Sequence, residues 1–233
     1  MKHKRFLDLF WEFNEFIVSL HTLYLDSIVG YKALYNVVLK EQKYLSELLG
    51  ECEVTEEEFQ DQCSMSYEDL CGDDHQVISM SPLMKQGDII NRTKPNGENW
   101  ILIGRQCVVS AYTYWEEYLR KEIAYALEVL IPDKKYEKKE IEKILNKHVA
   151  SDFWGDIRHF RNSIVHKNGI ANSDMARCKY LKWFSPDEAI VLDHEKMRRI
   201  FLEMGKYRNS LHTLSLPPRE SIKIPKKLLE RSS

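Results

Sequence analysis

Residues 151–166 have the pattern of one amphipathic helix, and this stretch constrains the fold and the function more than any other. Apolar side chains recur there at steps of three and four residues, which is the spacing of one helix face: Phe153, Ile157, Phe160 and Ile164. Ser151 or Asp152 can cap the start of this helix, and Gly169 can end it. The stretch therefore predicts a helix with one face in a hydrophobic core and one polar face.

The polar face of this helix carries Arg161, Asn162 and His166, which form the pattern Arg-Asn-x-x-x-His. A guanidinium group can bind two phosphate oxygens and stabilise the negative charge that develops on a phosphorus centre under attack. An imidazole can accept or donate a proton near neutral pH. Asn162 can hold the phosphate or orient the histidine. These residue types predict cleavage of RNA, whose 2′-hydroxyl is its own nucleophile, with neither a metal nor another cofactor.

The spacing of the two principal residues raises a geometric problem. Arg161 and His166 are five residues apart, which corresponds to about 140° of rotation on an ideal helix. We therefore expect His166 to share a face with His159, and Arg161 to lie nearer Arg158. A complete site then requires either a local distortion near the helix end or the same helix from a partner subunit across a twofold axis. The pattern predicts a homodimer with a composite active site.

The rest of the chain favours an all-α fold. Glycine and proline are sparse, at nine and seven residues, and this favours long helices over a turn-rich β fold. Apolar periodicity predicts helices over 4–28, 31–49, 99–131, about 140–146 and 193–214. We expect Gly30 to separate the first two helices, which then form an antiparallel pair. A small β-hairpin is expected from residues 178–184 and 188–192.

Residues 51–98 differ in character from the predicted helices. Ten acidic residues lie between Glu51 and Asp74, and loop signals follow them. We interpret this segment as a loop-rich, partly mobile insertion in one helical domain over 1–216, which a basic tail over 217–233 follows. Four potential zinc ligands lack the close Cys-x-x-Cys pair of a strong site, so no metal site is predicted: Cys52, Cys63, Cys71 and His75.

The composition argues against a membrane-spanning or secreted chain. No stretch reaches the ~18 uncharged apolar residues that a transmembrane helix needs. Asp8 and Glu12 interrupt the apolar run behind the basic N-terminus, and the cysteines are odd in number, so we expect a cytoplasmic protein. Residues 1–98 carry nine Lys and Arg against 18 Asp and Glu, whereas residues 99–233 carry 25 against 18. The second part offers either a local basic surface or ordinary solvated helix faces.

The segment Phe160–Gly169 resembles the Arg-x(4–6)-His signature of HEPN domains, including the polar residue that follows the arginine. The aromatic stretch Tyr114–Leu119, which precedes it on a long helix, is similar to what the family's all-α bundle contains. The resemblance implies an HEPN-like helical bundle and a metal-independent endoribonuclease that dimerises, usually in prokaryotic defence, toxin–antitoxin or stress systems. It also implies that Arg161 and His166 are catalytic and that Asn162 supports them.

The same interpretation also predicts which molecules the protein binds. We expect RNA, a second copy of the chain and a cognate antitoxin or sensor protein. The basic side chains beside the motif, those of Arg158, His159 and Lys167, are the residues that we expect to bind RNA. The acidic residues of 51–74 and the basic second part of the chain are candidate docking surfaces for a protein partner.

Two alternatives stay open at the level of sequence. The first is an HEPN-type module that binds RNA, a nucleotide or a protein without cleaving anything. The second is an unrelated helical protein in which Arg161 forms a surface ion pair with Asp156 or Glu116. In that protein His166 would only cap the C-terminus of its helix, where a cationic side chain is favourable.

Overall fold

The computed structural model is largely helical, and it describes residues 2–49, 63–65 and 83–216. Among these residues the only β ladder has two residues on each strand, so the all-α fold class predicted from the sequence is confirmed. No helix in this part of the chain is both long enough and apolar enough to cross a lipid bilayer. Most of the acidic stretch and the predicted basic tail over 217–233 lie outside the described residues.

The chain divides into two compact units. The second unit contains residues 22–107 and 191–197, and the first contains the rest. Three helices contribute residues to both units: α1 (Lys2–Leu49), α5 (Glu98–Tyr114) and α9 (His194–Ser215). A single domain over 1–216, which the sequence suggested, stays a prediction because the two units share these helices.

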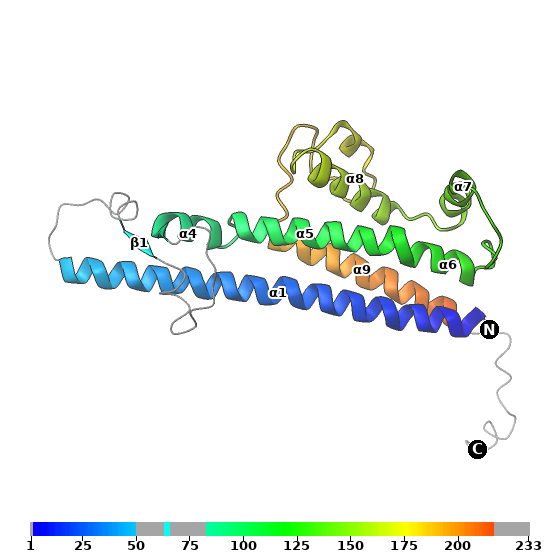
Figure 1. Cartoon of the computed structure of the whole chain (residues 1–233), viewed down its shortest axis with the longest axis horizontal. Coiled ribbons are helices and arrows are strands. Elements are labelled where there is room, and N and C mark those ends of the chain that lie inside the picture. Colours follow the sequence, from blue (N-terminus) through cyan, green and yellow to red (C-terminus); the bar gives the residue numbers. More distant parts are fainter. Residues whose placement is uncertain (1, 50–62, 66–82, 217–233) are drawn as a thin grey trace, which may run out of the picture. The chain divides into compact units, whose positions relative to one another are not determined.

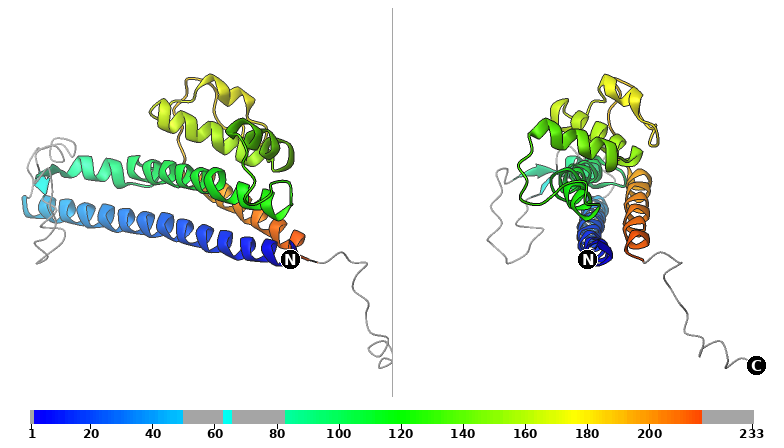
Figure 2. Two further views of the ribbon diagram at one scale, coloured as in Figure 1. Left: turned by 45° about the vertical axis from the view of Figure 1, so that its right-hand side comes forward. Right: turned by 90° about the vertical axis from the view of Figure 1, so that its right-hand side faces the viewer.

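The first unit contains five further elements: η1 (Trp115–Leu119, a π-helix), α6 (Arg120–Ala126), α7 (Lys138–His148), α8 (Asp152–His166) and η2 (Ser173–Arg177, a 3₁₀-helix). The start of α1 lies beside the end of α9, since His3 Nδ1 is 3.4 Å from the Leu214 carbonyl oxygen. The Arg208 guanidinium of α9 also donates to Asn14 Oδ1 of α1 at 2.7 Å. The two helices are therefore antiparallel (Figures 1 and 2), and α8 packs against η1 through Trp154 and Trp115.

Aromatic packing holds α8 against its neighbours in this unit. The indole of Trp154 stacks on that of Trp115, with ring centroids 4.9 Å apart and planes 3° from parallel. Trp154 also meets Tyr207 of α9 edge-on at 6.0 Å and Phe13 of α1 at 6.2 Å. Such offset and edge-to-face geometries are the favourable ones for aromatic pairs. One side chain of α8 thus joins the three helices beneath it.

A buried carboxylate ties α8 to the loop that follows η2. Asp156 is 2% exposed. Its oxygens accept hydrogen bonds from the backbone N–H groups of Lys179 at 2.9 Å, Tyr180 at 2.7 Å and Leu181 at 2.6 Å. Since hydrogen bonds to a charged acceptor are stronger than neutral ones, this clamp fixes the loop on the helix.

The second unit joins α4 (Gln86–Thr93) to the later part of α1 through a small apolar core of Val38, Ile89 and Ile90. Strands β1 (Ser64–Met65) and β2 (Met84–Lys85) pair antiparallel just before α4. Residues 86–93 form a helix although the sequence predicts that they belong to a loop-rich insertion. Eight residues are too few for a clear apolar period, which is why the pattern did not reveal it.

The predicted break at Gly30 is wrong, because α1 is one continuous helix from Lys2 to Leu49. Glycine inside a helix costs only about 1 kcal/mol relative to alanine, and no proline adds to that cost. The buried face continues past the glycine, from Tyr24 and Ile28 to Val38. The predicted antiparallel pair of 4–28 with 31–49 therefore does not form, and α9 is an antiparallel neighbour of α1 instead.

The predicted β-hairpin over 178–192 is also wrong. This segment has no strand, and its backbone pairs through one isolated bridge, between Ile170 and Ala189. The physical reason is the Asp156 clamp, which takes the N–H groups of residues 179–181 that a partner strand would need. The alternating apolar residues reflect contacts of an irregular loop with α8.

The remaining helices lie where the sequence predicts them, but some of them begin or end at different residues. The long helix predicted over 99–131 ends at Ala126, and its middle is the π-helix η1. Helix α7 is longer than the predicted 140–146. Helix α9 begins after Asp193, whose side chain caps it by accepting from the Lys196 N–H at 2.9 Å, as predicted.

We predict that Asp156→Ala destabilises the protein strongly. The change leaves three backbone N–H groups without their acceptor, and each buried unsatisfied group costs about 1–3 kcal/mol. The free energy of unfolding should fall by roughly 3–5 kcal/mol in urea titrations. Asp152→Ala is the matched control, because within the described ranges this exposed carboxylate pairs only with the exposed Lys179 ammonium, and the change should alter stability little.

We predict that Gly30→Ala stabilises the protein by about 1 kcal/mol, since alanine is the better helix former and a Cβ at this position meets nothing within 4 Å. Gly205→Ala in α9, where a Cβ also meets nothing, is the reference for a glycine inside a helix. Thermal melts of both variants provide the comparison. A loss of stability for Gly30→Ala alone would mean that the chain turns at this residue.

Candidate active site

Arg161 and His166 are in direct contact on α8. The guanidinium Nη1 of Arg161 is 3.2 Å from His166 Nε2 and donates to Asn162 Oδ1 at 3.1 Å. The expectation that the two principal side chains point to different sides of the helix is therefore wrong. His166 is the last residue of α8, and the long arginine side chain spans the rotation between them. One chain thus brings all three motif residues together without a partner.

The three motif residues differ in exposure. Arg161 and Asn162 are half-buried, whereas His166 is exposed. The Nε atom of Arg161 is buried and has no hydrogen-bond partner within the described chain. Because Nη1 serves both Asn162 and His166, the Nη2 hydrogens remain for an external acceptor. A guanidinium with spare donors beside an exposed imidazole is suited to a phosphate group.

The C-terminus of α8 determines where the imidazole lies. The Ser163 carbonyl accepts from the N–H groups of Lys167 at 3.0 Å and Gly169 at 3.1 Å. Gly169 has φ 79°, which is the left-handed conformation that ends many helices, as predicted for this glycine. The buried Ser163 hydroxyl also accepts from the Asn172 N–H at 3.1 Å, which draws the following loop back onto the helix. His166 is consequently held at an exposed helix end.

A cleft of about 320 Å³ lies beside the motif, and we call it the Arg161 cleft. Its lining includes Glu116, Glu117, Glu142, Arg158, Arg161 and Asn162. Two of the carboxylates are neutralised by neighbours outside the cleft, because Glu116 pairs with Arg120 at 3.1 Å and Glu117 with Lys121 at 3.2 Å. The cleft therefore has mixed charge and is not uniformly basic. His166 does not line it.

The residues predicted to bind RNA fall into two groups. Arg158 and Lys167 are exposed, and the Arg158 side chain makes no hydrogen bond or ion pair with the described part of the chain. His159 is half-buried, and its Nδ1 atom is buried with no partner there. Burial lowers the pKa of His159, and the carboxylates of Asp174 and Asp156 only partly oppose this effect. Arg158 and Lys167 can thus meet phosphate as cations, whereas His159 is neutral at pH 7.

The alternative ion pairs of Arg161 are not present among the described residues. Asp156 accepts from backbone N–H groups, and Glu116 pairs with Arg120. The side chain of Arg161 reaches Asn162 and His166 instead. His166 is the last residue of α8, and its imidazole contacts the Arg161 guanidinium.

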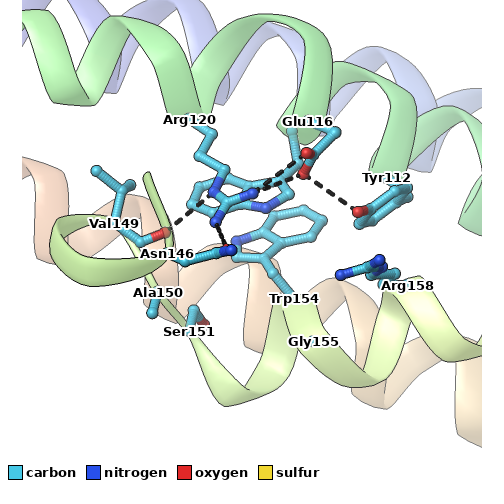
Figure 3. Close-up of a pocket in the computed structure, with 11 residues that line it drawn as sticks. Tyr112, Glu116, Arg120, Asn146, Val149, Ala150, Ser151, Trp154, Gly155 and Arg158 are labelled. Carbon is cyan, nitrogen blue, oxygen red and sulfur yellow. Dashed lines mark hydrogen bonds and ion pairs between the residues drawn. The ribbon is translucent and has the colours of Figure 1, made fainter. Parts of the chain in front are cut away.

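Sequence reasoning missed a polar network next to the motif (Figure 3). Arg120 donates through Nε to the Val149 carbonyl at 3.2 Å and through Nη2 to Asn146 Oδ1 at 2.6 Å, and it pairs with Glu116. The Tyr112 hydroxyl donates to the same carboxylate at 3.1 Å. The four-residue spacing of Tyr112, Glu116 and Arg120 was the available signal, because it puts them on one helix face.

No metal site is found in the described ranges, where no three His, Cys, Asp or Glu side chains gather closely enough to hold an ion. Of the four weak zinc candidates only Cys63 is described. Cys52, Cys71 and His75 lie outside the described residues.

Comparisons of the chain with protein-family models, with curated proteins and with solved structures found no match. The similarity to HEPN domains therefore stays a prediction that rests on the motif.

We predict that the stability of the protein depends on pH through the protonation of His159. Its pKa lies below the ordinary 6.5 because burial disfavours the charged imidazole. The unfolded chain therefore binds the proton first, so stability is complete above about pH 6.5 and falls as the pH drops toward the folded-state pKa. His159→Gln should lose this part of the pH dependence in unfolding titrations. His148→Gln, at an exposed histidine, should keep it.

Proposed function

We propose that this protein is an HEPN-type endoribonuclease that cleaves RNA through attack of the 2′-hydroxyl and needs no metal. The observation that supports this most is the contact of Arg161 Nη1 with His166 Nε2 at 3.2 Å, beside Asn162 and at an exposed helix end. A cation for the phosphate and a base for the proton are the two groups that this reaction requires. The HEPN-like bundle is part of the same proposal.

The chemical step uses the motif as follows. An arginine nitrogen can only donate, so His166 Nε2 is the acceptor in its contact with Arg161. When a phosphate takes over the guanidinium, Nε2 is released to accept the proton of the 2′-hydroxyl. The 2′-oxygen then bonds to phosphorus, and the bond from phosphorus to the 5′-oxygen breaks. That oxygen takes up a proton, which leaves a 2′,3′-cyclic phosphate and a 5′-hydroxyl end.

Within this proposal the active form is a homodimer. The reaction transfers one proton from the 2′-oxygen and another to the 5′-oxygen, and in an in-line displacement these two oxygens lie on opposite sides of the phosphorus, where two imidazoles can act at the same time. A second His166 across a twofold axis would supply the other. The exposure of His166 leaves it accessible to such a partner. An antitoxin or sensor protein would control the enzyme in a cytoplasmic defence or stress system.

One observation favours the alternative of an HEPN-type module that binds without cleaving. Three carboxylates line the Arg161 cleft, and they would repel a polyanion: Glu116, Glu117 and Glu142. Two of them are already paired with a cation, which reduces this repulsion. A module of this kind would bind RNA or a nucleotide at Arg161 and leave the strand intact.

We predict that the purified protein cuts single-stranded RNA in the presence of EDTA and yields 2′,3′-cyclic phosphate ends, as mass spectrometry of the products would show. His166→Ala and Arg161→Ala should lower the cleavage rate by about 100-fold or more, because each removes a catalytic group. His148→Ala and Arg177→Ala are matched controls at exposed positions outside the motif, and they should cut like the wild type.

The outcomes separate the hypotheses. A DNA strand of the same sequence should stay intact because it lacks the nucleophile. Cleavage only after a divalent metal is added would contradict the mechanism. RNA that is bound but never cut would favour the binding module. Full activity of a monomer, identified by light scattering, would contradict the composite site but not the ribonuclease.

A further inference from the structure

A second pocket lies beside the Arg161 cleft, between η1, the end of α7 and the start of α8 (Figure 3). We call it the Trp154 pocket, and its lining includes Glu116, Arg120, Asn146, Ser151, Trp154 and Arg158. Its volume is about 170 Å³, several times the ~30 Å³ share of one water molecule. Tyr112, Glu116 and Arg158 line both this pocket and the Arg161 cleft, so the two are neighbours on one surface.

The pocket contains a buried donor without an acceptor. Trp154 is 2% exposed, and its Nε1 has no hydrogen-bond partner within the described chain. Figure 3 shows the indole nitrogen turned toward Asn146 and Arg120. The Oδ1 atom of Asn146 already accepts from Arg120, so the amide presents its N–H groups as well. The Trp154 and Asn146 side chains therefore both present donors there, and an unsatisfied buried donor is costly unless an acceptor arrives.

The charges in the pocket favour an anion. Glu116 is neutralised by Arg120 and also accepts from the Tyr112 hydroxyl. Arg158 is exposed and has no hydrogen bond or ion pair with a described residue, so it contributes an uncompensated positive charge. An excess of donors together with an unpaired guanidinium is what phosphate recognition requires.

The start of α8 lies at the same pocket, which Ser151, Trp154 and Gly155 line. Ser151 occupies the N-cap position, but its side chain makes no capping hydrogen bond. The first intrahelical bond runs from the Gly155 N–H to the Ser151 carbonyl, which leaves the amides of residues 152–154 without a helical acceptor. Free amides and the helix dipole both attract an anion at a helix N-terminus. The buried Trp154 indole is the independent sign that this end is a site.

We propose that the Trp154 pocket is a phosphate-binding subsite, held by Trp154 Nε1, Arg158 and the start of α8. That the phosphate belongs to the strand being cut rests on the proposed ribonuclease function. Trp154 and Arg161 are seven residues apart on α8, or about 10 Å along the helix, a length that successive nucleotides of an extended strand can bridge. Arg161 would hold the scissile phosphate while the pocket holds a phosphate further along the strand.

Binding to the pocket is measurable without any catalysis. Inorganic phosphate is the probe, and the indole ¹H–¹⁵N resonance of Trp154, identified by its absence in Trp154→Phe, is the signal. Phosphate should shift this resonance in the wild type and in His166→Ala. Arg158→Gln should weaken phosphate binding about 10-fold or more, because it removes a charged hydrogen bond. Arg177→Gln, at an exposed arginine outside the pocket, should bind phosphate like the wild type.

Trp154→Phe keeps a ring on Trp115 but removes the N–H donor, so calorimetry should show weaker phosphate binding by that variant as well. Arg158→Gln changes an exposed side chain without described bonds, so its result does not depend on folding. A wild-type Trp154 resonance that phosphate leaves unmoved, or that moves equally in Arg158→Gln, would overturn the subsite even if RNA is cleaved. Phosphate binding in a protein that cleaves no RNA would support the subsite and overturn the ribonuclease.

In cleavage assays the subsite has a distinct signature. Arg158→Gln should raise the KM for a longer strand about 10-fold and should change the KM for a dinucleotide much less, because a dinucleotide has no phosphate for the pocket. A comparison of a 5′-phosphorylated dinucleotide with its unphosphorylated form tests whether the pocket binds a terminal phosphate. A comparison of both with the longer strand tests whether it binds a phosphate inside a strand. Equal effects of Arg158→Gln on long and short substrates would contradict the subsite.

Discussion

The stacking of Trp154 on Trp115 is the contact on which the functional geometry depends. Their ring centroids are 4.9 Å apart, and Trp154 also packs against Tyr207 and Phe13. A buried tryptophan of this kind stabilises a fold by about 3–5 kcal/mol relative to alanine. Because α8 is amphipathic, fixing its apolar face on the aromatic cluster also decides where its polar face lies. The positions of Arg158 and Arg161 follow from that packing.

Two backbone features refine this arrangement. The π-turn of η1 buries Trp115 and Leu119, yet it leaves the Glu116 side chain partly exposed at both pockets. Such turns are often found at functional sites. On the other side of α8, Asp156 replaces a partner strand by binding three consecutive loop amides. The helix is therefore held by apolar contacts at its start and by a buried carboxylate near its middle.

The electrostatics of the site come from how carboxylates are paired rather than from net charge. Glu116 is bound by Arg120, so it does not cancel Arg158 or Arg161. This division of partners leaves Arg158 and Arg161 without a carboxylate partner among the described residues, in a protein whose formal net charge is −2.

Local patterns were enough to predict the all-α class, the helix around the motif, its end at Gly169 and the cap at Asp193, because these depend on neighbours in sequence. Tertiary structure alone decided that α1 continues past Gly30, since burial along the whole helix outweighs the small cost of one glycine. It also decided that residues 179–181 bind Asp156 instead of forming a hairpin. Most of all, it decided that Arg161 meets His166, because ideal helical rotation ignores the reach of a long side chain at a helix end.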